Sequence, residues 1–220
     1  MFPDAEGVAV AAAHSLVRRI NDAVRRRGVA SVAVSGGRTP AEMFRMMSSM
    51  TVNWPNLHVW QVDERVAPDG DPVRNSGLLA TLPVSADHIH AMPVTGDDLP
   101  AAAVRYATSL PARFDVVHLG MGDDGHTASW PPGDTVIDSP LPVALSEPYN
   151  GHVRMTLTPS VVNSARTRIV VLTGEAKAVP LLGWMLERDL PISRVRRPRT
   201  TIFADEAACS KIRSFAQPGG

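Results

Sequence analysis

Apolar and polar residues alternate with the period of an α-helix near the amino end of the chain. The apolar positions recur every four residues, and arginines cluster toward the end of the same segment. The apolar positions are Val8, Ala12, Leu16, Ile20 and Val24. This spacing predicts an amphipathic helix, which ends at Gly28 because glycine is favoured directly after the last helical turn.

Four short runs rich in β-branched and apolar residues predict buried strands. They cover residues 29–35, 57–62, 114–120 and 168–174. Helical patterns separate these runs, and strands that alternate with helices form a parallel sheet with right-handed crossovers. We therefore predict an α/β fold with a mainly parallel sheet flanked by helices, in one domain that spans residues 1–220.

A glycine loop follows the first of these strands, in the sequence Ser-Gly-Gly-Arg-Thr-Pro. Thr39 and Pro40 predict the N-cap and the first residue of the next helix. The consecutive glycines Gly36 and Gly37 allow backbone N–H groups to turn toward an anion, which the helix dipole also attracts. Arg38 favours an anion such as phosphate, whereas a tight turn without a ligand is an equal alternative for this segment alone. The loop is neither a P-loop nor the Gly-x-Gly-x-x-Gly of dinucleotide-binding folds.

Charged residues stand at the boundaries of three other predicted elements. Asp63, Glu64 and Arg65 follow the second strand, where they form either a solvated edge or part of a crevice at the carboxyl end of the sheet. Taken alone, the solvated edge is favoured. Arg154, near the start of a strand, and Lys177, in the first turns of a helix, are each by themselves more typical of surface charges.

The segment from His118 to Trp130 carries the strongest catalytic signal. An apolar strand ends there in Gly-Met-Gly-Asp-Asp-Gly-His-Thr, and the glycines permit unusual backbone geometry. Asp124 and His126 supply groups that accept or orient a proton. A lone histidine is usually structural, but this setting indicates that His126 is a general base.

Composition limits the classes of function. The chain has 22 Lys+Arg and 22 Asp+Glu, so its formal net charge is zero, which argues against a nucleic-acid or membrane-binding surface. The single cysteine, Cys209, cannot form an intramolecular disulfide, and the chain has no run of about 18 apolar residues of the kind that spans a membrane. The first residues place their acids before their arginines, unlike a signal peptide, so we expect a cytoplasmic protein.

Neither a metal site nor a serine nucleophile is indicated. His88 and His90 would share one face of a strand, but no His-Glu-x-x-His or cysteine-rich pattern accompanies them. The sequence Gly-x-Ser-x-Gly is absent, and Ser129 lies in another context. We therefore expect no metal and no cofactor.

Taken in order, these segments resemble the 6-phosphogluconolactonase family, within the broader glucosamine-6-phosphate isomerase/6-phosphogluconolactonase superfamily. The resemblance rests on the region of Asn75 and on the stretches VSGGRTP, WQVDERVAP, LGMGDDGHTASWPPG, RMTLTPSVVNSA, LTGEAKA, LPISRV and FADEAA. It implies a modified Rossmann-like fold without a nucleotide. It also implies hydrolysis of 6-phosphoglucono-δ-lactone, a small-molecule sugar phosphate, in the oxidative pentose phosphate pathway.

The chain departs from the family pattern at three places. Arg38 stands where a small residue is common, Arg74 precedes Asn75 where serine is frequent, and Trp130 with Pro131 stands where Leu-Phe is usual. None of these changes removes the proposed base or the glycine loop.

The catalytic expectation is that neutral His126 takes a proton from the attacking water and that Asp124 orients the imidazole or the loop. Oxygen atoms of the substrate are expected to meet backbone, hydroxyl and charged donors. The expected substrate- and phosphate-binding residues are Gly36, Gly37, Arg38, Thr39, Asp63, Arg65, Asn75, Arg154 and Lys177. Which cations hold the phosphate, and which the developing oxyanion, is left open.

Two other functions compete with lactone hydrolysis. An amino-sugar phosphate isomerase or deaminase would use the same crevice with a carboxylate base. A catalytically silent module would bind a sugar phosphate and be stabilised by it without turnover. The oligomeric state is not predicted.

Overall fold

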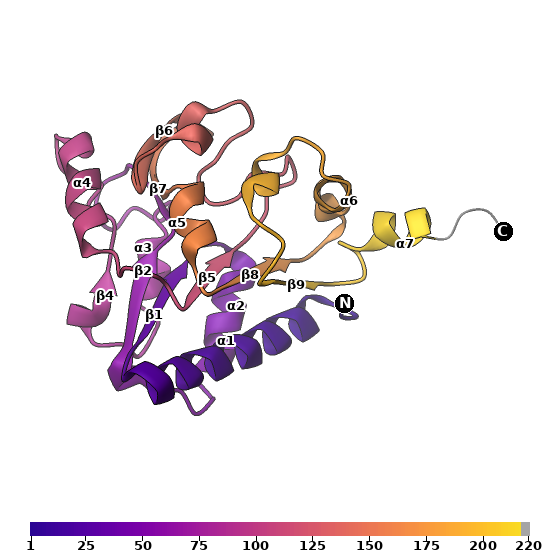
Figure 1. Cartoon of the computed structure of the whole chain (residues 1–220), viewed down its shortest axis with the longest axis horizontal. Helices are drawn as coiled ribbons and strands as arrows, with labels where there is room; N and C mark the ends of the chain where they lie inside the picture. The colour runs from indigo at the N-terminus through magenta and orange to yellow at the C-terminus, as the bar shows by residue number, and fades with distance from the viewer. Residues whose placement is uncertain (217–220) are drawn as a thin grey trace.

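The computed structural model describes residues 1–216, apart from the side chains of Arg38 and Ala216, and its centre is a six-stranded parallel sheet. The strand order is β4-β2-β1-β5-β8-β9, which confirms the predicted α/β fold with a mainly parallel sheet (Figure 1). The strands are β1 (Ala30–Val34), β2 (Leu57–Gln61), β4 (Ile89–His90), β5 (Val116–Leu119), β8 (Thr167–Leu172) and β9 (Thr200–Ala204).

A second, antiparallel sheet of three strands stands beside the parallel one. Its order is β3-β7-β6, with β3 at Asp63–Arg65, β6 at Val143–Tyr149 and β7 at His152–Leu157. Only Val62 separates β3 from β2, so the chain passes directly from the parallel sheet into the small one. The small sheet therefore places charged residues next to the carboxyl ends of the parallel strands.

Helices cover both faces of the parallel sheet, with α1 and α2 on one side and α4, α5 and α6 on the other (Figure 1). The helices are α1 (Ala5–Arg27), α2 (Arg38–Met47), α3 (Ser76–Leu79), α4 (Leu99–Ser109), α5 (Pro159–Ser164), α6 (Ala178–Met185) and α7 (Ser210–Ala216). Short 3₁₀ turns are η1 (Trp54–Asn56), η2 (Ala86–His88), η3 (Thr135–Asp138), η4 (Glu175–Lys177) and η5 (Pro191–Arg194). None of the helices within the described residues is long and apolar enough to cross a membrane.

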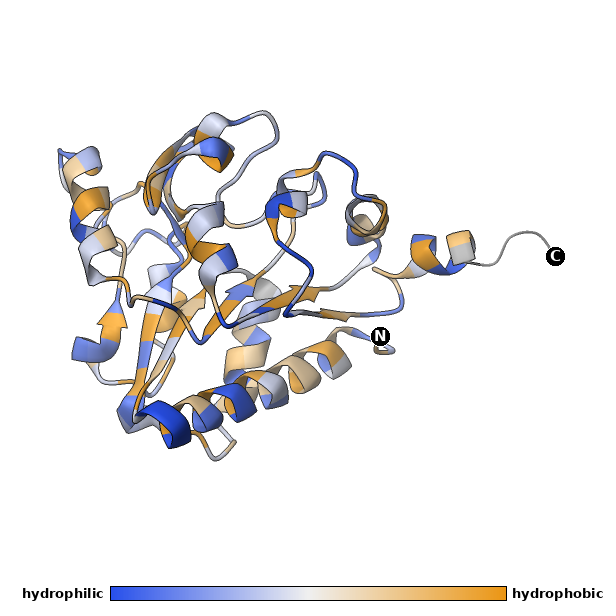
Figure 2. Ribbon diagram, in the orientation of Figure 1, coloured by the Kyte–Doolittle hydropathy of each residue, from blue (hydrophilic) through white to orange (hydrophobic). Residues whose placement is uncertain are grey.

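The first helix has the ends that its sequence predicts. The Asp4 carboxylate accepts a hydrogen bond from the Gly7 amide at 2.8 Å, and Gly28 closes the helix with a φ of 78°. Its apolar stripe packs on the sheet, while its last turn is arginine-rich and strongly polar (Figure 2). The arginines also suit the negative end of the helix dipole.

The sheet separates two apolar cores, because successive side chains on each strand point to opposite faces. On β1, Val32 and Val34 pack beneath α1 and α2, whereas Ala33 faces the other core with Trp60. This two-sided burial explains why the strands are nearly continuous apolar runs in the sequence.

The start of α2 differs from the expectation. The helix begins at Arg38 with Gly37 as its N-cap, so Thr39 lies inside the first turn and is not the cap. Gly37 has a φ of 120°, a conformation that favours glycine, and the Thr39 hydroxyl is instead 2.9 Å from the Thr173 hydroxyl. The prediction was wrong because a contact with the loop after β8 takes the hydroxyl that would have capped the helix.

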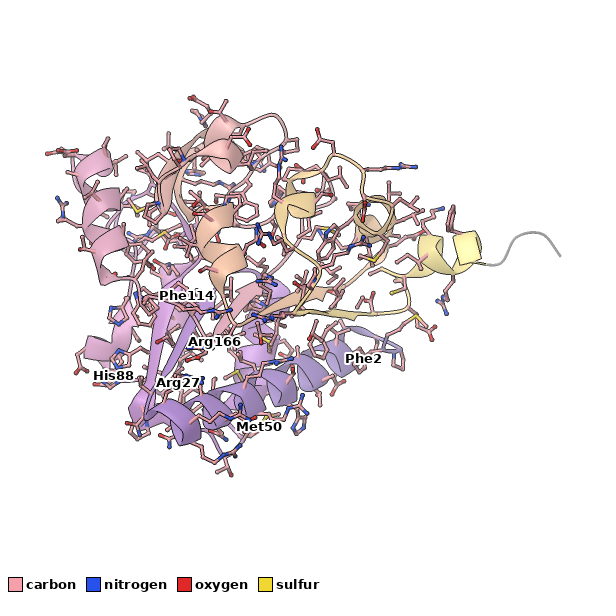
Figure 3. The ribbon with its side chains drawn as sticks, viewed as in Figure 1. Phe2, Arg27, Met50, His88, Phe114 and Arg166 are labelled. Carbon is pink, nitrogen blue, oxygen red and sulfur yellow. The ribbon has the colours of Figure 1, made fainter. Side chains whose placement is uncertain are left out.

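The amino ends of the strands carry a buried polar anchor. Asp115, just before β5, lies 2.6 Å from a guanidinium nitrogen of Arg27 and 3.2 Å from one of Arg166, and it accepts the Ser31 amide. Figure 3 labels both arginines, which approach from the end of α1 and from the segment before β8. This pairing joins α1 to the sheet at the edge opposite the carboxyl ends.

Candidate active site

A cleft of about 980 Å³ opens at the carboxyl ends of the parallel strands. The loops after β1, β2, β5 and β8 contribute to its wall, which is the expected position for a site in an α/β sheet. The structure brings nine of the predicted site residues into this wall: Gly36, Gly37, Thr39, Asp63, Arg65, Asn75, His126, Arg154 and Lys177. Asp124 lies behind His126, and the Arg38 side chain is outside the described residues.

The glycine loop needs its first glycine because Asn75 lies against it. A Cβ atom on residue 36 would stand 1.9 Å from Asn75 Oδ1, far inside contact distance. Asn75 in turn accepts a hydrogen bond from Arg65 and donates one of 3.0 Å to the Asp63 carbonyl oxygen. The loop, Asn75 and the small sheet therefore form one packed wall.

Asp63 is a buried carboxylate in the cleft wall. Its Oδ2 accepts a 2.8 Å hydrogen bond from the Ser129 hydroxyl. Burial raises the pKa of Asp63 above the usual carboxyl value, although Arg65, Ser129 and Arg154 act in the opposite direction. Asp63 is 5% exposed and Glu64 is fully buried, so the solvated-edge alternative for this segment is wrong.

Glu64 points away from the cleft and holds the neighbouring loop. Its two oxygens accept hydrogen bonds of 2.7–2.9 Å from the amides of Arg65, Asn75 and Ser76 and from the Gln61 side chain. With its lone pairs satisfied in this way, Glu64 fixes the loop rather than presenting a carboxylate to a substrate.

Arg65 and Arg154 place two positive charges side by side. They are register partners in the β3–β7 pair, and the Nε of each has no hydrogen-bond partner among the described residues. Burial and the nearby Arg65 lower the pKa of Arg154. Two guanidinium groups with unused donors in a cleft form a site suited to an anion.

His126 and Asp124 form a hydrogen-bonded pair in the loop after β5. His126 Nδ1 is 2.7 Å from Asp124 Oδ1, which also accepts the His126 amide at 3.0 Å. Gly122 makes room for the pair, because a Cβ there would stand 2.1 Å from His126 Nδ1. The His126 side chain is 26% exposed, so the imidazole is held on one edge and open to water elsewhere.

The charge on Asp124 determines which imidazole nitrogen carries the proton. Burial alone would raise the pKa of Asp124, but hydrogen bonds from Tyr149 and His126 outweigh it and lower that pKa. An ionised Asp124 accepts the proton of Nδ1, so in neutral His126 the free lone pair is on Nε2. This tautomer is the one that a general base in the cleft requires.

The loops after β8 and β9 close the opposite side of the cleft. Lys177 lies there, and the structure records no ion pair or hydrogen bond for its side chain within residues 1–216. Both carboxylate oxygens of Asp205 accept from the Gly174 amide, at 3.1 and 2.9 Å, which fixes the turn before Lys177. The cation can thus serve a ligand without losing another partner.

Two departures from the family pattern have structural roles outside the cleft wall. The Arg74 side chain is nearly buried and lies 3.3 Å from Glu64 and 2.7 Å from Asp69. Trp130 is fully buried, and its indole N–H donates to the Leu157 carbonyl oxygen at 2.8 Å. Arg74 therefore stabilises the loop that carries Asn75, and Trp130 is a core residue.

The other histidines near strands differ from His126. His118 on β5 is fully buried, and burial lowers its pKa to about 4. His88 lies in η2, so only His90 is in β4; their rings stack on His58 at 3.9 Å and on Trp60 at 4.0 Å, respectively. Among the described residues, no group of three or more His, Cys, Asp or Glu side chains could hold a metal ion.

The sequence interpretation missed Tyr149, whose hydroxyl donates to Asp124 Oδ2 at 2.6 Å and lies 3.3 Å from His126 Nδ1. It also missed Ser129 as the donor to Asp63. Neither residue has a local pattern that identifies it, because each partner lies 23 or more residues away along the chain.

The chain is similar in sequence to known proteins. Residues 3–203 match the family model described as glucosamine-6-phosphate isomerases/6-phosphogluconolactonase. A 6-phosphogluconolactonase of Streptomyces coelicolor is 33% identical and aligns with 98% of this chain and 95% of its own length. One of Mesorhizobium japonicum is 36% identical over 80% of each chain.

Solved structures show the same relationship. The crystal structure of a 6-phosphogluconolactonase from Shewanella baltica superposes with a TM-score of 0.82 at 27% identity, over 93% of this chain and 95% of that one. A fold match of this extent leaves few elements of either protein unpaired. The chain belongs to the glucosamine-6-phosphate isomerase/6-phosphogluconolactonase family.

Proposed function

We propose that the protein is a 6-phosphogluconolactonase, which hydrolyses 6-phospho-D-glucono-1,5-lactone to 6-phosphogluconate in the oxidative pentose phosphate pathway. The observation that carries this proposal is the His126–Asp124 pair, set in the same cleft as Arg65, Arg154 and Lys177. A general base and an anion-binding wall are the two parts that hydrolysis of a phosphorylated lactone requires. Relatives of this chain carry the same name.

In the proposed mechanism, His126 Nε2 takes a proton from water while the water oxygen forms a bond to C1 of the lactone. The carbonyl electrons move onto its oxygen, and the imidazolium is stabilised by Asp124. When the carbonyl re-forms, the bond between C1 and the ring oxygen breaks, and His126 returns the proton to that oxygen. The product is an open-chain acid with a hydroxyl group, and no covalent enzyme intermediate forms.

The acceleration required of these groups is modest, since the lactone is an activated ester. General-base catalysis contributes about 10²–10⁴-fold, and donors that stabilise the oxyanion contribute about 10²–10³-fold. The proposed donors to substrate oxygens are the amides of Gly36 and Gly37 with the Thr39 hydroxyl, and Asp63 and Asn75 hold the wall from which they act. No step of this scheme uses a metal ion or a cofactor.

One observation favours the isomerase or deaminase as the second candidate. Asp63 is a buried carboxylate in the cleft wall with a raised pKa, which is the kind of group that removes a proton from a carbon next to a carbonyl. An assay with glucosamine 6-phosphate separates the two reactions. Turnover of that substrate, with loss on Asp63→Asn, would support this second function.

The decisive experiment compares hydrolysis of the 6-phospho lactone with its spontaneous rate and with hydrolysis of unphosphorylated gluconolactone. Charge-assisted hydrogen bonds contribute about 1.5–3 kcal/mol each, so losing two implies about 10²–10⁴ lower kcat/KM for the unphosphorylated compound. Equal efficiency toward both lactones would contradict the sugar-phosphate assignment. Ligand-induced stabilisation without turnover would indicate a silent binding module.

The roles of the cations follow from the same pair of substrates. Methionine variants of Arg38, Arg65, Arg154 and Lys177 keep much of the side-chain length and remove the charge. Replacing a residue that binds the phosphate should lower kcat/KM only for the 6-phospho lactone, because the other compound lacks a phosphate group. A residue that stabilises the oxyanion should affect both compounds equally.

We also propose that the enzyme works in the cytoplasm and that residues 1–220 form one domain. The single cysteine and the balanced charge support a reducing, aqueous compartment. Cell fractionation followed by the lactonase assay tests the location. A single cooperative unfolding transition followed by two spectroscopic probes tests the domain.

A further inference from the structure

Tyr149 contacts the catalytic pair but has no place in the mechanism derived above. It is the last residue of β6, and the two-residue turn Asn150–Gly151, with φ values of 49° and 81°, leads into β7. The register of the β6–β7 pair shifts between Ser146 and Tyr149. Such a bulge changes the direction in which side chains point, and here it accompanies a tyrosine aimed across the cleft wall at the loop after β5.

The phenol and Asp124 form a close and directional contact. The Tyr149 hydroxyl donates to Asp124 Oδ2 at 2.6 Å, while Asp124 Oδ1 is the oxygen that faces His126 Nδ1. The two oxygens of one carboxylate are therefore held from opposite ends. Burial and the neighbouring Asp124 raise the pKa of Tyr149, so the phenol remains a proton donor.

The ring of Tyr149 has a second partner on the anion-binding side. The Arg154 guanidinium carbon is 5.0 Å from the ring centroid, and Arg154 Nη2 donates to the Tyr149 carbonyl oxygen at 3.3 Å. Phenylalanine keeps both the ring and the backbone carbonyl. The substitution Tyr149→Phe therefore removes the contact with Asp124 and leaves the support of Arg154 in place.

We infer that Tyr149 is a positioning residue for catalysis, which sets the orientation and basicity of His126 through Asp124. This inference rests on the proposed function. The hydrogen bond to Oδ2 fixes the rotation of the carboxylate, so that Oδ1 meets Nδ1 and the lone pair of Nε2 faces the cleft. It also draws negative charge away from Asp124, which weakens the attraction of the carboxylate for the imidazolium.

Loss of the Tyr149 hydroxyl should change both the basicity and the orientation of His126. With more charge on Asp124 the imidazolium becomes more stable, so the pH at which kcat/KM is half-maximal should rise by about 0.5 pH unit. A carboxylate free to rotate should lower kcat about 3–10-fold with KM little changed. The other charged groups of the cleft wall are the same in both proteins: Glu6, Glu42, Arg45, Asp63, Arg65, Asp123, Arg154, Lys177 and Asp205.

The chain contains a matched control in its other tyrosine. The Tyr106 hydroxyl is buried and donates to the carbonyl oxygens of Gln61 and His90, at 2.9 and 3.2 Å. Tyr106→Phe should lower Tm by about 2–4 °C through the lost hydrogen bonds. It should leave the pH profile unchanged, because Tyr106 does not contact Asp124 or His126.

The experiment measures kcat/KM against pH for the parent, Tyr149→Phe and Tyr106→Phe proteins, and repeats Tyr149→Phe in an Asp124→Asn background. We expect the upward shift only with Tyr149→Phe, and no further shift in the Asp124→Asn background. An unmoved profile, or the same shift without Asp124, would overturn the inference.

A measurement independent of turnover separates this inference from the proposed function. The imidazole proton signals of His126, identified by their loss in His126→Asn, can be titrated by NMR in each protein. A higher titration midpoint in Tyr149→Phe supports the positioning role even if the lactone is not hydrolysed. An identical midpoint in the parent and in Tyr149→Phe refutes the positioning role even if the protein hydrolyses the lactone.

Discussion

Strand β5 and the loop that follows it each carry a histidine, and the two have opposite chemistry. His118 is fully buried, and neither of its ring nitrogens has a hydrogen-bond partner among the described residues. His126, eight positions later, has a carboxylate on one nitrogen and access to water. Burial suppresses the charged form of His118, whereas the carboxylate partner and the open second edge of His126 suit the general base that we propose.

The largest expected effect comes from exchanging each histidine in turn. His126→Asn should lower kcat for the 6-phospho lactone by about 10²–10⁴ while a substrate analogue still binds, because the lost group acts on the proton in the transition state. His118→Leu should keep the parental kcat. Rates corrected for spontaneous hydrolysis measure both, and an unchanged rate in His126→Asn would exclude it as the base.

The next effect concerns stability, and it belongs to His118. Its pKa in the folded protein, about 4, is lower than the ordinary value of about 6.5, so protonation favours the unfolded chain. Its contribution to the free energy of unfolding is intact above pH 6.5 and is lost as the pH falls toward 4, by about 3 kcal/mol in total.

Urea unfolding across this pH range tests that prediction. The parent protein should lose stability as the pH falls, whereas His118→Leu should lose about 3 kcal/mol less. The same pH dependence in His118→Leu and in the parent would show that the buried imidazole does not control acid stability.

A smaller effect should follow from crowding His126 and Asp124, the proposed catalytic pair, without changing either residue. In Gly122→Ala the new methyl group would stand 2.1 Å from His126 Nδ1 and 2.6 Å from Asp124 Oδ1, so the pair must move apart. We expect kcat to fall about 10–10²-fold. Gly120→Ala is the matched control, since a Cβ there meets no atom within 4 Å. Equal kcat values for Gly122→Ala and Gly120→Ala would mean that catalysis does not depend on the close packing around His126 Nδ1.

The smallest expected effect is that of a chelator. Because the proposed reaction uses no metal ion, prolonged treatment with EDTA should leave kcat unchanged. Reproducible loss of activity that one divalent ion restores would contradict a metal-free reaction.

Much of the fold was predictable because its signals are local. The strands are apolar runs covered on both sides, and the loops at their carboxyl ends carry charged residues and glycines in short stretches of sequence. His126 and Asp124 are two residues apart, so their pairing was visible in one loop. The antiparallel pairing of β3, β6 and β7 was not predictable from the sequence, because pairing between distant strands leaves no periodicity in either strand.

The same limit explains the residues that were missed or misplaced. Tyr149 reaches Asp124 through a hairpin and a bulge, neither of which has a composition that indicates a catalytic role. Thr39 has the residue type of an N-cap, but a tertiary contact with Thr173 decides its position. Asp63 and Glu64 are consecutive residues of β3, so their side chains point to opposite faces of the strand. The sequence does not tell which of the two faces the cleft and which faces the neighbouring loop.

The buried carboxylate of Glu64 also has a consequence for the order in which the cleft is assembled during folding. Its hydrogen bonds join partners at most 12 residues away, so they close short loops at low entropic cost. The Ser129–Asp63 contact spans 66 residues, and the pairing of Arg65 with Arg154 spans more. The loop around Asn75 can therefore form early from a continuous stretch of chain, while Arg65 and Arg154 meet only when the distant strand β7 docks.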